Sequence, residues 1–305
     1  MQRFANGAQW ASRQRRGGRA LVLAVIFLSL SGLFSAPPAA AATGMKVVIV
    51  VGPTESGTAH NIADAQQLAA QARGYGATVT EIYSPNATWS RVRSAAQGAN
   101  VFIYMGHGNG WPSPYKPFTS RTKDGLGLNA TANAGNSNTR HYGEWYLTRY
   151  IHLAPNAVVI LRGLCYSAGN SEPGKAAPSV ATGQQRIDNY AAGFLRTGAK
   201  AVFAEPYGGV GYILDAIFQS DLTVREIFST GGGGGWGDGW GDGWGWSSAW
   251  GASGGGSSGL TSTTFPSART GFATVISDRD ASGRFRRSVV GNLDLTATSV
   301  RQAGS

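Results

Sequence analysis

The sequence predicts an α/β protein, a three-layer sandwich in which helices flank a mostly parallel β-sheet. Short apolar runs rich in Val and Ile alternate with stretches that repeat apolar residues at helical spacing, the order expected of a parallel sheet with crossover helices. Several runs are continuously apolar, which is typical of strands covered on both faces. The expected strands are 47–51, 77–83, 101–105, 157–161 and 199–204, and the expected helices are 61–73, 89–97, 144–151, 185–196, 211–218 and 222–228.

The first helix shows why such stretches are assigned as helical. Its apolar residues recur three and four positions apart, so they share one face. Gly74 and Gly76 follow it, and glycine favours the end of a helix. A long loop is expected over 109–141. The apolar face of the first helix is formed by Ile62, Ala65, Leu68, Ala69 and Ala72.

Two more strands are expected near the C-terminus. Residues 271–277 and 285–295 alternate apolar and polar residues around a turn-rich segment, 278–283, and this pattern is typical of a β-hairpin. The hairpin either adds antiparallel strands to the sheet edge or forms a small separate unit. We therefore expect an α/β domain over 43–230 and a C-terminal β-hairpin appendage over 260–305.

Between these two parts, the segment 231–259 is Gly/Trp-rich and of low complexity. Trp recurs every fourth residue at Trp236, Trp240 and Trp244. Ordering so many glycines into a helix or strand costs more conformational entropy than their contacts can offset. We therefore expect a flexible linker or an adhesive loop. Because Trp side chains can stack on sugars, this segment is also a candidate site for carbohydrate or cell-wall polymers.

The first 42 residues have the pattern of a secretory signal peptide. A basic stretch precedes an apolar run from Ala20 to Phe34, and small residues follow up to Ala42. The apolar run is shorter than the roughly 20 residues that span a bilayer. We expect cleavage near Ala42 and a secreted or cell-surface protein. The alternative is a retained segment that anchors the chain to the membrane.

Charge and cysteine content limit the classes of function. The formal net charge is +10, and five of the arginines lie in the first 42 residues. The other Lys and Arg residues are scattered along the chain, so nucleic acid is not an expected partner. The single Cys excludes an internal disulfide, so the core alone must hold the fold.

Two expected strands are followed by residues that can react together, a histidine and a cysteine. The strand 101–105 leads into Gly106-His107-Gly108, and the strand 157–161 leads into Gly163-Leu164-Cys165. Open parallel sheets place their sites beyond the carboxyl ends of such strands. If the two strands are neighbours, an imidazole and a thiol meet, and nucleophilic catalysis by a thiol requires at least this pair of groups.

This interpretation also needs donors for an oxyanion. The backbone N–H groups of Gly108 and Cys165 are the natural candidates. The alternative is that His107 is a turn residue satisfied by backbone carbonyls and that Cys165 is an inert core residue, because free Cys is often buried.

The same residues carry a resemblance to the caspase-like, or clan CD, cysteine peptidases, which include caspases, legumains, gingipains and clostripain. The family pattern is an apolar strand with His-Gly, followed some fifty residues later by a second apolar strand with Ala-Cys. Here His107-Gly108 and Leu164-Cys165 lie 58 residues apart. Residues 165–169 resemble the surroundings of the legumain Cys, and 194–202 is similar to the helix, Gly-Ala and strand that follow in the family.

The resemblance implies a six-stranded sheet flanked by helices and an endopeptidase that cleaves polypeptides. It implies that Cys165 attacks the peptide carbonyl and that His107 protonates the leaving amine.

The family's primary pocket holds a charge opposite to that of the substrate side chain. Glu205 is thus a candidate for binding Arg or Lys, Glu172 and Asp188 are competing candidates, and Arg162 would suit an acidic side chain.

No cofactor or metal is expected. The segment 52–58 has the glycine spacing of a phosphate loop but lacks its Lys. His60, His141 and His152 could join His107 in a metal site, yet no helical His pair is present. The rival to the peptidase is a non-catalytic surface protein that binds carbohydrate or cell wall through its Trp-rich segment.

Overall fold

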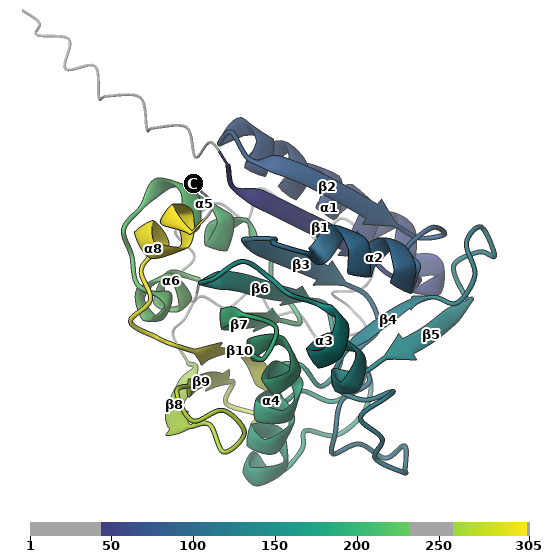
Figure 1. Cartoon of the computed structure of the whole chain (residues 1–305). Helices are drawn as coiled ribbons and strands as arrows, with labels where there is room; N and C mark the ends of the chain where they lie inside the picture. The colour runs from purple at the N-terminus through teal and green to yellow at the C-terminus, as the bar shows by residue number, and fades with distance from the viewer. Residues whose placement is uncertain (1–43, 232–258, 304–305) are drawn as a thin grey trace, which may run out of the picture. The chain divides into compact units, whose positions relative to one another are not determined.

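The computed structural model describes residues 44–231 and 259–303, and it is built around one eight-stranded sheet flanked by helices (Figure 1). The expected α/β class with a mostly parallel sheet is confirmed. The strand order is β2-β1-β3-β6-β7-β10-β9-β8, and the first five of these strands are parallel. The parallel strands are β1 (Lys46–Val51), β2 (Thr78–Tyr83), β3 (Val101–Met105), β6 (Ala157–Arg162) and β7 (Ala199–Glu205).

Helices cover both faces of the sheet and enclose two hydrophobic cores. Neighbouring residues of β1 belong to different cores, with Val48 in one and Ile49 in the other, which explains the continuously apolar pattern of the strand. One core lies under α2 (Trp89–Ala96), α3 (Glu144–Tyr150) and α4 (Val180–Leu195). The other lies under α1 (Thr58–Gly74), α5 (Gly211–Gln219), α6 (Val224–Thr230) and α8 (Ala297–Gln302).

The C-terminal strands extend the same sheet. They are β8 (Thr261–Pro266), β9 (Thr274–Arg279) and β10 (Phe285–Gly291). β9 and β10 form the expected antiparallel pair, and β10 also pairs with β7. Of the two placements left open by the sequence, the structure thus has the hairpin at the sheet edge. With β8 and β9 included, the sheet is wider than the six strands that the family resemblance implies.

The expected loop 109–141 contains two short strands, β4 (Leu126–Asn129) and β5 (Thr139–Tyr142), which pair in a separate two-stranded sheet. Their four residues each are too few to show an alternating pattern. α4 begins five residues earlier than expected, because the side chain of Ser179 accepts a hydrogen bond from the amide of Thr182 and so caps the helix. The expected signal peptide, 1–42, lies outside the described residues, and so does the expected Gly/Trp-rich segment 231–259 except for its two end residues.

Within the described residues, no helix is both long enough and apolar enough to cross a membrane.

The packing of α4 on β10 gives a test of the fold. A Cβ atom at Gly183 would lie 2.0 Å from the ring of Phe285, which is fully buried. We expect Gly183→Ala to lower the free energy of unfolding by about 1–3 kcal/mol, because the ring has no room to move. Urea denaturation measures this value.

The matched control is Gly74→Ala at the end of α1, where no atom lies within 4 Å of the added methyl group. It should leave stability unchanged or raise it by up to about 1 kcal/mol. Equal stability of the two variants would contradict the packing of α4 against β10.

Candidate functional site

The sheet brings the two strand-end motifs together. β3 and β6 are adjacent and parallel, with Met105 paired to Arg162 at their carboxyl ends. His107 follows β3 by two residues and Cys165 follows β6 by three, so both lie beyond the same edge of the sheet. The two strands are therefore neighbours, which is the condition that the predicted His–Cys pair requires.

The backbones of the two motifs pack in direct contact. A Cβ atom at Gly108 would lie 2.0 Å from the carbonyl oxygen of Cys165 and 2.9 Å from its amide nitrogen. Only glycine permits this approach. The two amides proposed as oxyanion donors, those of Gly108 and Cys165, therefore belong to neighbouring peptide groups.

A third polar residue, Glu55, joins His107. Its Oε2 lies 3.0 Å from Nε2 of His107, and both side chains are partly exposed. Glu55 opens a 3₁₀ turn, η1 (Glu55–Gly57), beyond the carboxyl end of β1, the strand next to β3, and it has a positive φ of 48°. A positive φ is uncommon for a residue other than glycine and often accompanies a functional site.

Sequence reasoning missed Glu55 because it considered the segment 52–58 only as a phosphate loop. The signal that could have found it is its place after β1, since carboxyl ends of adjacent parallel strands share one sheet edge.

A buried tyrosine fixes the backbone of His107. Tyr104 is fully buried, and its hydroxyl accepts a hydrogen bond from the amide of Gly127 and donates to the carbonyl of the same residue, both at 2.8 Å. The carbonyl of His107 lies 3.1 Å from this hydroxyl. The strand β4, which contains Gly127, is thereby tied to the turn that carries His107.

His141 lies beside His107 but has a different electrostatic environment. Burial, together with the neighbouring His107, lowers the pKa of His141 to about 4. His141 is therefore a neutral imidazole at neutral pH. The described residues contain no group of three or more His, Cys, Asp or Glu side chains that could hold a metal ion.

Cys165 is a free, half-buried thiol. Burial raises its pKa to about 12, and the charge of Glu172 adds to this effect. The thiol is thus protonated at neutral pH. The residue before it, Leu164, is fully buried in the core, so the bulky side chain fits at this position.

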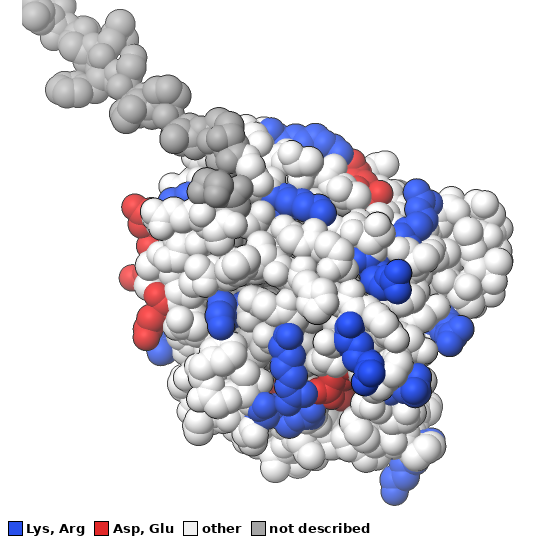
Figure 2. Space-filling model, in the orientation of Figure 1, with Lys and Arg blue, Asp and Glu red and all other residues white. Residues whose placement is uncertain are grey.

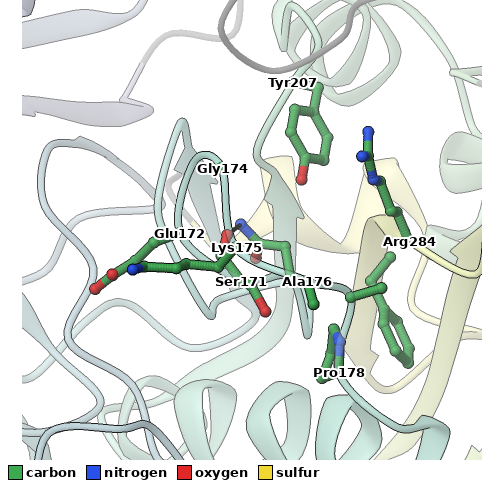
Figure 3. Close-up of a pocket in the computed structure, with 11 residues that line it drawn as sticks. Ser171, Glu172, Gly174, Lys175, Ala176, Pro178, Tyr207 and Arg284 are labelled. Atoms are coloured by element: carbon green, nitrogen blue, oxygen red, sulfur yellow. Dashed lines mark hydrogen bonds between the residues drawn. The ribbon is translucent and has the colours of Figure 1, made fainter.

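A cavity of about 320 Å³ is lined mainly by the loop that follows the Cys165 turn, together with Tyr207, Arg284 and Phe285 (Figure 3). Asn170 lines it and donates a hydrogen bond to the carbonyl of Leu164, 3.2 Å away. Glu172 also lines it, but in Figure 3 its carboxylate points away from Tyr207 and Arg284. The cavity is also lined by Ser171, Gly174, Lys175, Ala176, Ala177 and Pro178.

Among the three acidic candidates for substrate binding, Glu172 is the one whose charge acts on the thiol of Cys165. Its two carboxylate oxygens accept hydrogen bonds from the hydroxyls of Tyr166 and Tyr115, at 2.8 and 2.9 Å. Tyr166 directly follows Cys165 and has a positive φ of 70°. Glu172 therefore anchors the strained residue next to the thiol.

The other two acidic candidates have structural contacts. Glu205, at the end of β7, is buried and accepts a hydrogen bond from Tyr212 at 2.6 Å, and burial raises its pKa to about 7. Asp188 on α4 accepts hydrogen bonds from the amides of Ala268 and Arg269, at 2.8 and 3.1 Å, and so holds the turn after β8.

Arg162, the candidate for an acidic substrate, instead pairs with Asp64 of α1 at 2.5 Å.

The position of Glu172 gives a test of the thiol's electrostatics. We expect Glu172→Gln to lower the pKa of Cys165, because it removes the negative charge that opposes the thiolate, while burial remains. At pH 8–9, iodoacetamide should then label the folded protein a few-fold faster than wild type. Labelling rates across pH, followed by mass spectrometry, measure this change.

Asp294→Asn is the matched control, because Asp294 is an exposed carboxylate near the C-terminus, beyond β10. Its labelling rate should equal that of wild type. A Glu172→Gln rate that also equals wild type would contradict the role given to the Glu172 charge.

Comparison of this chain with models of protein families, with curated proteins and with solved structures gave no match.

Proposed function

We propose that this protein is a caspase-like cysteine endopeptidase that hydrolyses peptide bonds through a thioester on Cys165. One observation carries the proposal: adjacent parallel strands bring His107 and Cys165 to the same sheet edge, with Gly108 packed on the Cys165 peptide. The family resemblance of these motifs supports it. Export of the chain and a polypeptide substrate belong to the same proposal.

In the proposed reaction, Sγ of Cys165 attacks the carbonyl carbon of the scissile bond and its proton passes to His107. The amides of Gly108 and Cys165 donate hydrogen bonds to the oxyanion that forms. His107 then protonates the leaving amine as the C–N bond breaks, which leaves a thioester. Water, deprotonated by His107, attacks the thioester, releases the carboxylic acid and returns the proton to the sulfur.

Glu55 acts on His107 as a positioning residue in this scheme. Because its carboxylate binds Nε2, the imidazole keeps Nδ1 for exchange of the proton with sulfur. The carboxylate also stabilises the imidazolium that forms during attack. Since the resting thiol has a pKa of about 12, His107 accepts the proton during the attack and not before it.

Loss of either member of the dyad should abolish cleavage. We expect Cys165→Ala and His107→Ala to reduce kcat/KM on a denatured protein substrate by at least about 100-fold. His152→Ala is the matched control, because His152 is an exposed residue between α3 and β6 and should keep activity within about two-fold of wild type. Full activity of Cys165→Ala on every substrate cleaved by wild type would refute the proposal.

Changes at Glu55 separate its charge from its contact. Glu55→Gln keeps an acceptor for His107 but removes the charge, whereas Glu55→Ala removes both. We expect kcat to fall about 10-fold or less in the first variant and further in the second, with KM little changed, because the residue acts through His107. Steady-state kinetics measure both constants. Equal kcat in wild type and Glu55→Ala would show that Glu55 has no part in the reaction.

A further inference from the structure

A connected group of aromatic side chains lies on the face covered by α2 and α3. The rings of Trp89 and Tyr142 stack at 5.0 Å, and Tyr146 packs edge-on against both at 5.4 and 5.1 Å. Trp145 continues the group at 4.9 Å from Tyr146, and Tyr150 closes it at 5.7 Å from Trp145. The rings come from α2, β5 and α3, so the tertiary fold assembles them.

Four exposed arginines lie over these rings. The guanidinium of Arg121 lies 3.9 Å from the centre of the Trp145 ring, and that of Arg149 lies 5.0 Å from the same ring. Arg140 lies 5.2 Å from the ring of Tyr142, and Arg93 lies 5.8 Å from that of Tyr150. We call these four arginines and the connected group of five rings the arginine–aromatic face.

The part of the chain that supplies this face has no exposed acid to balance these charges. Residues 86–155, which supply the whole face, contain seven Lys and Arg but only two acids, and both acids, Asp124 and Glu144, are buried. Glu144 is already bound by Arg196 and Arg269. Within residues 44–231 and 259–303, none of the four arginines forms an ion pair. Figure 2, drawn from this side, shows several separate basic groups over α2 and α3 and little acidic surface.

We propose that the arginine–aromatic face binds an anionic polysaccharide, a chain that carries repeated sulfate or phosphate groups. Guanidinium groups bind such anions through paired hydrogen bonds, and stacking on a ring limits the orientations that each guanidinium can take. Cations on several elements, rather than in one pocket, match anions repeated along a chain. Association through this face depends on charge and falls as salt concentration rises.

The rings themselves favour a polysaccharide over single-stranded nucleic acid. Stacking of successive bases requires several open aromatic faces, but Trp145 is covered by Arg121 and Tyr142 is buried, and Tyr150 is the one exposed ring of the five. Binding of a sulfated or phosphorylated glycan needs only the cations. This inference is independent of the proposed peptidase reaction, and Cys165→Ala should bind the polysaccharide as well as wild type.

The test is a binding titration of the full chain with dextran sulfate as the probe and uncharged dextran as its control. We expect dextran sulfate to bind, to bind more weakly as salt increases, and to lose at least 10-fold in affinity in the double variant Arg121→Gln/Arg149→Gln. Arg93→Gln/Arg140→Gln should also weaken binding, since it removes the other two cations. Uncharged dextran should not bind.

The matched control is Arg73→Gln/Arg225→Gln, which removes two exposed arginines from α1 and α6, the helices over the opposite core. It should keep its affinity within about two-fold. Equal losses in this control and in the face variants would show a non-specific effect of net charge and overturn the proposal. So would unchanged affinity in both face variants.

Three further probes decide the class of partner: duplex DNA, polyglutamate and vesicles rich in phosphatidylserine. Each should bind more weakly than dextran sulfate at equal charge concentration. Tighter binding of any of them, lost in Arg121→Gln/Arg149→Gln, would overturn the assignment to a polysaccharide.

Discussion

The parallel pairing of β3 with β6 is the constraint on which the candidate site depends. It sets Met105 beside Arg162, so the turns that follow, with His107 and Cys165, must leave the sheet at the same edge. Because both strands are buried on both faces, a register shift would expose apolar side chains from two cores at once. The energetics of the core therefore determine the geometry of the site.

Beyond the strand ends, the site depends on close backbone contact and on buried polar groups. The Gly108 approach to Cys165 leaves no room for a side chain, and Tyr104 ties the His107 turn to β4. The same burial that orders this edge keeps the thiol protonated. In the proposed reaction the thiol loses its proton only as it attacks, so this resting state does not oppose it, and a protonated thiol is oxidised more slowly than a thiolate.

The sequence predicted the elements whose apolar pattern extends over at least five consecutive residues. The continuously apolar strands and the two motifs after them lie where expected, because burial on both faces leaves a clear signature. β4, β5 and β8 were missed, since four-residue strands and the polar run of β8 show no such pattern. Glu55 was missed because the segment 52–58 was considered only as a phosphate loop, and its contact with His107 forms only in the fold. Likewise, arginines that are scattered along the chain gather over α2 and α3 only in the fold.

Covalent trapping of the folded protein tests the dyad most directly. The protein is incubated with a mixture of peptidyl acyloxymethyl ketones, and the modified residue is located by peptide mapping with mass spectrometry. A functional dyad gives one adduct, on Cys165, that forms in native protein and at least about 10-fold more slowly in His107→Ala. An adduct that forms only after unfolding, or equally fast without His107, would contradict a nucleophile and base acting together at this edge.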